Sequence, residues 1–224
     1  MQSKAYDYLE KRIKEIEIGL GLTQKVSVDT DLSGFQELTK AYILLCHAEI
    51  EKYFEMICTQ TVFDSKKQFS EKNDINSALL SVASVCEYTI KGYNEKDNAI
   101  VSRLDPKVAT LEGRISNAYG KFITVAKGNN GIKTKDILNL LWPLGINEND
   151  VDTALLNALN SLGEKRGRIA HTGAAINKVT LNYDSEKKTM GDIITEIKAF
   201  DSLIMSKNYL NADTSYDEIE NILY

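Results

Sequence analysis

An arginine and a histidine stand five positions apart in the run RGRIAH, which spans Arg166 to His171. Arginine stays charged at physiological pH and binds phosphate oxygens through two N–H groups at once. Histidine has an ordinary pKa near neutrality, so it can accept or donate a proton there. The pair therefore suits the cleavage of RNA, in which a phosphate must be held while protons move.

Cleavage of RNA without a metal needs a base near the 2′-hydroxyl, an acid near the leaving 5′-oxygen and cations around the charged transition state. The chain contains only two histidines, His47 and His171, so an acid or base drawn from histidine must be one of them. Lys165 and Arg168 flank Arg166 and extend the local positive charge. The groups that could carry this chemistry are therefore few.

The spacing of Arg166 and His171 limits how they can cooperate. On a regular helix, residues five apart differ in direction by about 140°, so the two side chains would not share one face. Either the helix is interrupted near Gly167, or the working site combines residues from two copies of the chain. A two-fold dimer would gather two arginines and two histidines around one cleft.

His47 and Glu51 lie four residues apart in a second apolar-periodic segment, so they can face each other on a helix. A hydrogen bond between them would orient the imidazole beside the site or toward RNA. The alternative is a buried polar pair that fixes packing. The same spacing resembles half of a carboxylate-bridged metal site, but such a site needs a second pair and further glutamates. We therefore expect no metal and no cofactor.

Apolar residues recur at intervals of three and four along most of the chain, which predicts an all-α protein built as an up-and-down helical bundle with additional peripheral helices. A strand-like run at 179–183, followed by turn residues, allows one short hairpin near 176–188. The polar stretch 64–74 and the run GNNG at 128–131 are predicted loops. The expected helices cover about 4–20, 34–61, 76–91, 106–126, 135–141, a stripe from 150 through 162, and 190–209.

The length of 224 residues suits one helical domain, predicted over 1–210, followed by an acidic C-terminal tail over 211–224. The first twenty residues carry charges throughout and lack the apolar core of a signal peptide, and no segment is apolar enough to span a membrane. A cytoplasmic protein is expected. Three cysteines without CxxC spacing are predicted to be buried hydrophobic residues and not zinc ligands: Cys46, Cys58 and Cys86.

The net charge of −5 argues against a protein that coats nucleic acid with a broad basic face. A negative net charge is still compatible with local basic sites. One consists of Lys165, Arg166 and Arg168. A second would form if the fold gathers four further lysines: Lys121, Lys127, Lys133 and Lys135.

Two motifs carry a resemblance to a known family. The run RGRIAH resembles the motif of HEPN domains, in which an arginine and a histidine are separated by four to six residues. The run HAEIE at 47–51 is similar to the HA-x-x-E helix of the RiboL-PSP branch of that family. The likeness extends from about residue 34 to 205. It implies a homodimeric helical bundle with a metal-independent endoribonuclease site at the dimer interface, which acts in phage defence, a toxin system or RNA processing.

The resemblance matches Arg166 to the motif arginine and His171 to the motif histidine, and it gives Arg168 no role. The candidate supporting residues are His47, Glu51, Arg168 and Lys165. It implies an RNA substrate and an antitoxin or defence-system protein as a partner. Gly167 departs from the motif, because many members carry asparagine or another polar residue there. The alternative is a catalytically inactive HEPN-fold module that binds RNA or protein.

Two simpler interpretations remain. In one, Lys165, Arg166 and Arg168 are charges near a helix C-terminus that complement the helix dipole. In the other, the protein is a helical scaffold whose dimer surface is its whole function.

Overall fold

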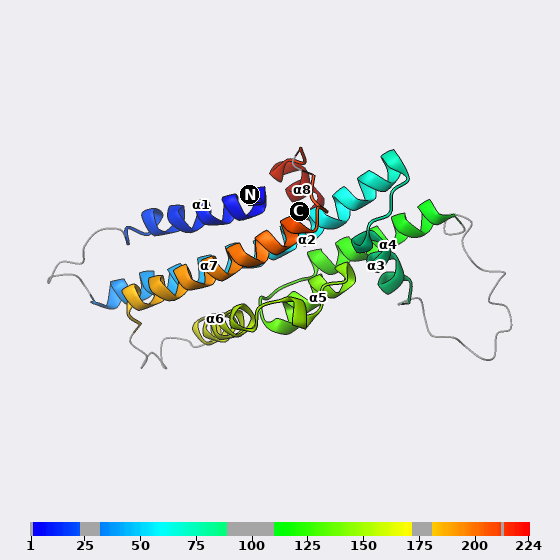
Figure 1. The fold of residues 1–224 in the computed structure, drawn as a ribbon. Coiled ribbons are helices and arrows are strands. Elements are labelled where there is room, and N and C mark those ends of the chain that lie inside the picture. The colour runs from blue at the N-terminus through cyan, green and yellow to red at the C-terminus, as the bar shows by residue number, and fades with distance from the viewer. Residues whose placement is uncertain (1, 23–31, 89–109, 172–180, 212) are drawn as a thin grey trace, which may run out of the picture. The chain divides into compact units, whose positions relative to one another are not determined.

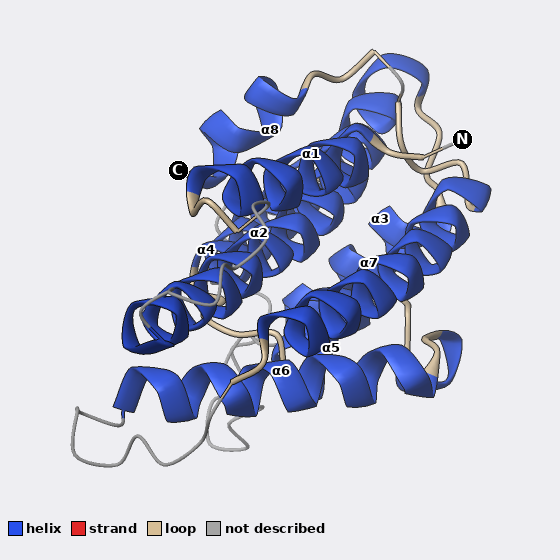
Figure 2. Ribbon diagram, turned by 90° about the vertical axis from the view of Figure 1, so that its left-hand side faces the viewer, coloured by secondary structure: helices blue, strands red, loops and turns tan. Residues whose placement is uncertain are grey.

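The structure is a computed structural model, and it describes residues 2–22, 32–88, 110–171, 181–211 and 213–224. Every regular element in these ranges is a helix, as Figure 2 shows, which confirms the all-α prediction. The α-helices are α1 (Lys4–Gly19), α2 (Leu32–Lys72), α3 (Ser77–Tyr88), α4 (Leu111–Lys127), α5 (Thr134–Leu141), α6 (Thr153–His171), α7 (Tyr183–Ser206) and α8 (Tyr216–Leu223). Short 3-10 turns cover Trp142–Leu144 and Glu148–Asp150.

The chain forms two compact units. The first unit consists of Met1–Phe54, Asn130–Ile137 and Asn149–Ser206. The second unit consists of Glu55–Asn129, Leu138–Glu148 and Lys207–Tyr224. The predicted division into a domain over 1–210 and a tail over 211–224 therefore does not follow these units, and it stays a prediction.

Aromatic side chains of α2 and α7 build the core of the first unit. The rings of Tyr42 and Tyr183 lie 5.4 Å apart, as do those of Phe54 and Phe200. All four side chains are buried, and Figure 1 shows α7 running along the first part of α2. Such edge-on and tilted ring contacts add to the free energy gained from burying the rings.

A buried carboxylate joins α1 to this pair of helices. The Asp201 side chain of α7 accepts hydrogen bonds from the Ser3 backbone N–H at 2.8 Å and the Tyr53 hydroxyl at 3.0 Å. The Ser3 hydroxyl donates to Oδ1 of the same carboxylate, the oxygen that also accepts from the Tyr53 hydroxyl. Ser3 is also the N-cap of α1, where its Oγ accepts from the Tyr6 N–H at 3.0 Å. One charge therefore holds the start of α1 against α2 and α7.

In the second unit, α2 continues as helix to Lys72, so the predicted loop at 64–74 is wrong over most of its length. The polar residues there are compatible with a helix because segments distant in sequence form hydrogen bonds with their side chains. The Asp64 carboxylate accepts from the Asn211 N–H at 2.8 Å and from the Thr214 hydroxyl at 2.5 Å. On the same stretch, Phe69 packs in a buried cluster with Leu79 of α3 and Ile115 of α4.

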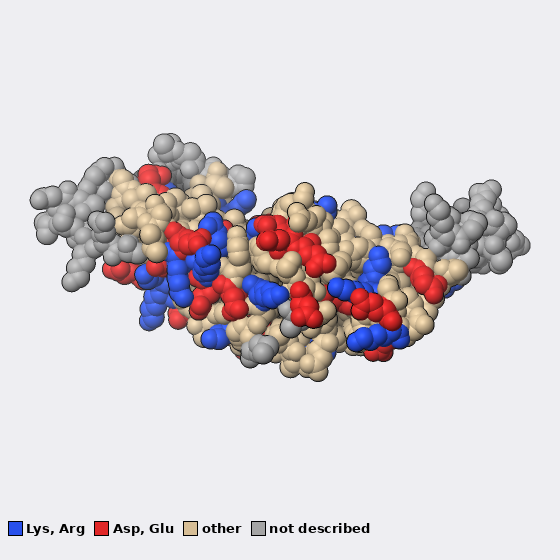
Figure 3. All heavy atoms as spheres, turned by 90° about the horizontal axis from the view of Figure 1, so that it is seen from above, with Lys and Arg blue, Asp and Glu red and all other residues tan. Residues whose placement is uncertain are grey.

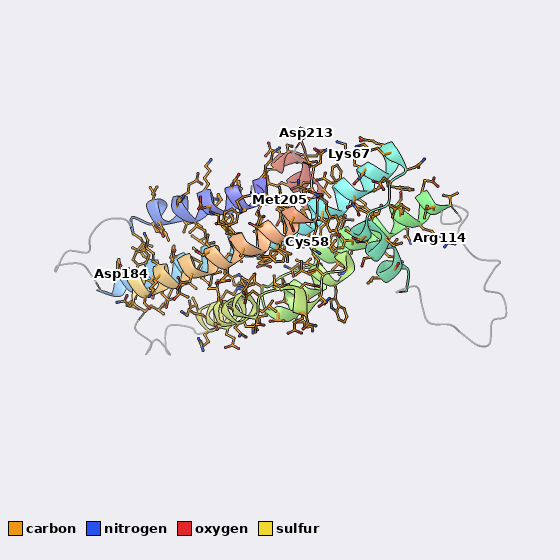
Figure 4. The ribbon with its side chains drawn as sticks, viewed as in Figure 1. Cys58, Lys67, Arg114, Asp184, Met205 and Asp213 are labelled. Carbon is orange, nitrogen blue, oxygen red and sulfur yellow. The ribbon has the colours of Figure 1, made fainter. Side chains whose placement is uncertain are left out.

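The expected hairpin near 176–188 is wrong where it can be compared, because α7 begins at Tyr183. The Asn182 side chain accepts a hydrogen bond from the Ser185 N–H at 2.9 Å and so caps the helix. Asp184, labelled in Figure 4, lies in the first turn, where a negative charge complements the helix dipole. The segment 172–180 lies outside the described residues.

The remaining boundaries agree with the periodicity, with local differences. Helix α1 ends one residue before its expected limit, and the loop at 128–131 separates α4 from α5 as predicted. The expected start of the fourth helix at Asp105–Pro106 lies outside the described residues, and Thr110 caps α4 in the structure. Within the predicted acidic tail, Ser215 caps α8, whose Ile219 and Leu223 are buried.

We expect Asp201→Asn to lower the free energy of unfolding by roughly 2–4 kcal/mol, because an amide cannot accept from all three buried donors. Urea denaturation followed by circular dichroism measures this. Asp192→Asn on the exposed face of α7 is the matched control and should change stability by less than about 0.5 kcal/mol. Equal stability of the two variants would refute the anchoring role of Asp201.

Candidate active site

Helix α6 carries the arginine and histidine motif and runs without a break through Gly167. Of the two alternatives that the spacing left open, an interruption of the helix near Gly167 is therefore excluded. An added Cβ at Gly167 would meet no atom within 4 Å, so neighbouring atoms do not require glycine there. Arg166 and His171 consequently keep the separation of about 140° that a regular helix imposes.

Two contacts fix α6 within the first unit. The Lys165 ammonium donates to both carboxylate oxygens of Glu186 on α7, at 2.8 and 2.6 Å. At the start of α5, the Thr134 backbone N–H donates to the side-chain oxygen Oδ1 of Asn160 at 2.8 Å. The side-chain Nδ2 of Asn160 donates in turn to the Thr134 hydroxyl at 2.7 Å. Lys165, predicted as a supporting cation, therefore links α6 to α7 through a carboxylate.

A glycine on α6 allows the segment before α5 to approach closely. A Cβ added at Gly163 would lie 2.9 Å from Cγ of Lys133, which is tighter than side-chain contacts normally are. In the same segment, the Asp136 carboxylate accepts from the Lys133 N–H at 3.2 Å. Asp136 is thus held at the N-terminal turn of α5 and in the first unit.

His47 is almost fully buried on α2, with 3% of its surface exposed. Its Nδ1 lies 3.5 Å from Oε2 of Glu51, at the long limit for a hydrogen bond. Burial and, to a smaller extent, the charge of Arg166 lower the pKa of His47 to about 4, against a small opposing effect of Asp136. The imidazole is therefore neutral at pH 7, and its contact with Glu51 is a polar contact and not an ion pair.

The electrostatic effect of Arg166 on His47 indicates that these two residues lie within range of each other's charge in the first unit. Helix α2 supplies a buried neutral imidazole, and α6 supplies a solvent-exposed guanidinium. Arg168 is exposed on the same helix, whereas the side chain of His171 lies outside the described residues. Such a site can bind a phosphate through Arg166, with His47 as a neutral hydrogen-bonding group.

Asp136 was not predicted from the sequence as part of this site. It lies 89 positions after His47 in the chain, so no helical spacing connects the two residues. The only local signal is an acidic residue in the first turn of a helix, which is common and carries no information about a site.

A comparison with protein families identifies the chain. The family model described as RiboL-PSP-HEPN matches residues 7–206, which include both motifs. The chain belongs to the RiboL-PSP-HEPN family. No curated protein and no solved structure matches it significantly. Because HEPN proteins are commonly ribonucleases, membership agrees with the chemistry of an arginine beside a histidine.

The surface charges of this HEPN protein are mixed, as the face in Figure 3 shows. On α1, Arg12 pairs with Glu15 at 2.6 Å and with Glu49 of α2 at 3.0 Å. The second predicted lysine group is divided between the two units, since Lys121 and Lys127 belong to the second unit and 133 and 135 to the first. Its assembly stays a prediction.

The cysteines of the HEPN chain are inert where the structure describes them. Cys46 and Cys58, the latter labelled in Figure 4, are buried free thiols. Burial raises the pKa of Cys46 to about 12, so its reactive thiolate is scarce at neutral pH. The side chain of Cys86 lies outside the described residues. Across the described ranges, no three His, Cys, Asp or Glu side chains gather as metal ligands, and no helix is long and apolar enough to cross a membrane.

We expect Arg166→Ala to raise the pKa of His47 toward its ordinary value of about 6.5 without reaching it, because burial is the larger cause of the shift. The chain has two histidines, so NMR titration can follow each imidazole separately. Arg168→Ala is the matched control and should leave the pKa of His47 unchanged. A wild-type His47 that titrates near 6.5, or an unchanged pKa in Arg166→Ala, would contradict this geometry.

Proposed function

We propose that this HEPN protein is a metal-independent endoribonuclease. The observation that supports it best is the exposed Arg166 beside the buried, neutral His47, on the helix that carries the family motif. Arginine provides the permanent charge that an RNA phosphate requires, and the motif supplies His171 about 1.4 turns later.

The proposed reaction is attack of the 2′-hydroxyl oxygen on the adjacent phosphorus. The P–O5′ bond breaks, which leaves a 2′,3′-cyclic phosphate and a free 5′-hydroxyl. A base removes the 2′-hydroxyl proton, and an acid delivers one proton to the leaving 5′-oxygen, so no water or metal enters the balance. In this scheme Arg166 holds the scissile phosphate and stabilises its additional negative charge.

His171 is proposed as the general base or acid, because the lowered pKa makes His47 a weak base and leaves it without the acidic imidazolium form at pH 7. His47 then serves as a hydrogen-bonding group whose orientation Glu51 supports. Lys165 acts indirectly, since its pair with Glu186 holds α6 in place. Arg168 adds a second exposed positive charge on α6.

Two copies of the chain are needed for the complete site in this proposal. On the unbroken α6, Arg166 and His171 diverge by about 140°, so one copy does not direct both side chains at a single phosphate. A two-fold dimer can place the arginine of one copy opposite the histidine of the other. The proposed setting is a cytoplasmic toxin or phage-defence system with an antitoxin or defence partner, which only the family membership supports.

A second candidate is an inactive HEPN module that binds RNA or protein. The observation in its favour is Gly167, which lacks the polar side chain many HEPN proteins carry there. Because an added Cβ at Gly167 meets no atom within 4 Å, a side chain would fit, and its absence removes one polar group from the site. Binding of RNA without turnover would favour this candidate.

We expect the purified protein to cleave single-stranded RNA in EDTA and to leave 2′,3′-cyclic phosphate ends. Arg166→Ala and His171→Ala should each lower the rate at least about 100-fold, as expected for loss of transition-state charge stabilisation or proton transfer. Gel analysis of end-labelled RNA measures the cleavage rates and identifies the product ends. Lys188→Ala, an exposed lysine on α7, is the control and should retain full activity. A requirement for Mg²⁺, or full activity in His171→Ala, would refute the proposal.

A further inference from the structure

The interior of α6 contains a glycine whose missing β-carbon leaves room for the side chain of a lysine distant in sequence. Gly163 is buried, and a Cβ built on it would lie 2.9, 3.8 and 3.4 Å from Cγ, Cδ and Cε of Lys133. Glycine weakens a helix interior relative to alanine, so a packing reason is expected for it. Here the reason is that the aliphatic stem of Lys133 lies against α6.

The backbone that carries Lys133 is fixed beside α6. Two hydrogen bonds join the next residue, Thr134, to Asn160, which precedes Gly163 by three residues. The Lys133 N–H donates to the Asp136 carboxylate at 3.2 Å, which orders the start of α5. All of these residues belong to the first unit. Because Lys133 is nevertheless an exposed residue, its stem packs on the helix while its ammonium remains accessible to solvent.

Arg166 lies on the same side of α6 as this lysine stem. It follows Gly163 by three residues, and residues three apart are neighbours on a helix surface, about 4.5 Å apart along the axis. Long side chains on a helix lean toward the preceding turn, which directs Arg166 back toward Gly163. We therefore expect the Lys133 ammonium and the Arg166 guanidinium to serve the same stretch of surface.

Both positive charges are accessible to an anion. Lys133 and Arg166 are exposed, and among the residues that the structure describes neither forms an ion pair with a carboxylate. Lys165, in contrast, donates to both carboxylate oxygens of Glu186. The contact with Asp136 uses the backbone N–H of Lys133 and not its ammonium. A ligand that carries several negative charges can therefore engage both cations.

We propose that Lys133 is a second phosphate-binding residue of this site and that it holds the phosphate next to the scissile one on a single-stranded RNA. The inference rests on the proposed function, in which Arg166 holds the scissile phosphate. The neighbouring phosphate along the strand is then the group within reach of Lys133. A lysine ammonium suits this role because it binds phosphate as a point charge and requires no single orientation.

Binding of an uncleavable RNA analogue tests this role. Lys133→Met keeps an unbranched stem over Gly163 and removes the charge. It should weaken binding of a single-stranded 2′-O-methyl oligonucleotide about tenfold at low salt. The logarithm of the binding constant should also fall less steeply with the logarithm of salt concentration, by about 0.7 in slope, as for the loss of one phosphate contact. Lys135→Met removes an exposed charge two residues away and is the matched control, which should leave that slope unchanged. Fluorescence anisotropy over a salt series measures both quantities.

A glycine substitution tests the seat of the lysine while the lysine itself is kept. Gly163→Ala places a methyl group where the stem of Lys133 lies, so it should weaken binding of the same oligonucleotide about as much as Lys133→Met. Gly191→Ala on α7 is the matched control, because a Cβ there meets no atom within 4 Å, and it should keep wild-type affinity. Circular dichroism should show that all of these variants are folded.

Two kinds of result would overturn the inference. One is wild-type affinity in Lys133→Met or in Gly163→Ala, and the other is a wild type that does not bind the oligonucleotide. Cleavage of unmodified RNA by the same proteins separates this inference from the proposed ribonuclease. Binding that depends on Lys133 without any cleavage refutes only the ribonuclease, whereas cleavage with the same KM in wild type and Lys133→Met refutes only the role of Lys133.

Discussion

The buried face of α2 is the constraint on which the candidate site depends. Its rings pack on α7, and the same helix buries His47 with 3% of the residue exposed. Burial, reinforced by Arg166, then holds the pKa of that imidazole far below its ordinary value. Packing of one helix therefore determines both the core of the first unit and the protonation state of a histidine in the site.

The regular course of α6 is a second constraint on the candidate site. Because it continues regularly through Gly167, it presents Arg166 and His171 in different directions. A single chain thus has Arg166 within electrostatic reach of His47. The unbroken helix is the physical reason for proposing a site shared between two copies.

Much of the fold was predictable, because apolar spacing reports directly which face of a helix is buried. The first helix and the final long helix both bury apolar residues at this spacing, such as Leu9 and Ile197. The predicted loop was wrong where hydrogen-bond partners distant in sequence determine the local structure. Asp64 lies in helix because 211–214 supplies its hydrogen-bond donors. The motif pair was visible from spacing, but the meeting of His47 with Arg166 and Asp136 requires the folded chain.

Complementation between two inactive variants tests the central proposal most directly. In that proposal, one site takes its arginine and its histidine from different copies of the chain. Arg166→Ala and His171→Ala proteins would be mixed, allowed to exchange subunits and tested for RNA cleavage in EDTA. Each mixed dimer would keep one intact pairing of an arginine from one copy with a histidine from the other. A shared site predicts that the mixture regains a substantial part of wild-type activity. A mixture that exchanges subunits yet remains as inactive as its components would contradict it.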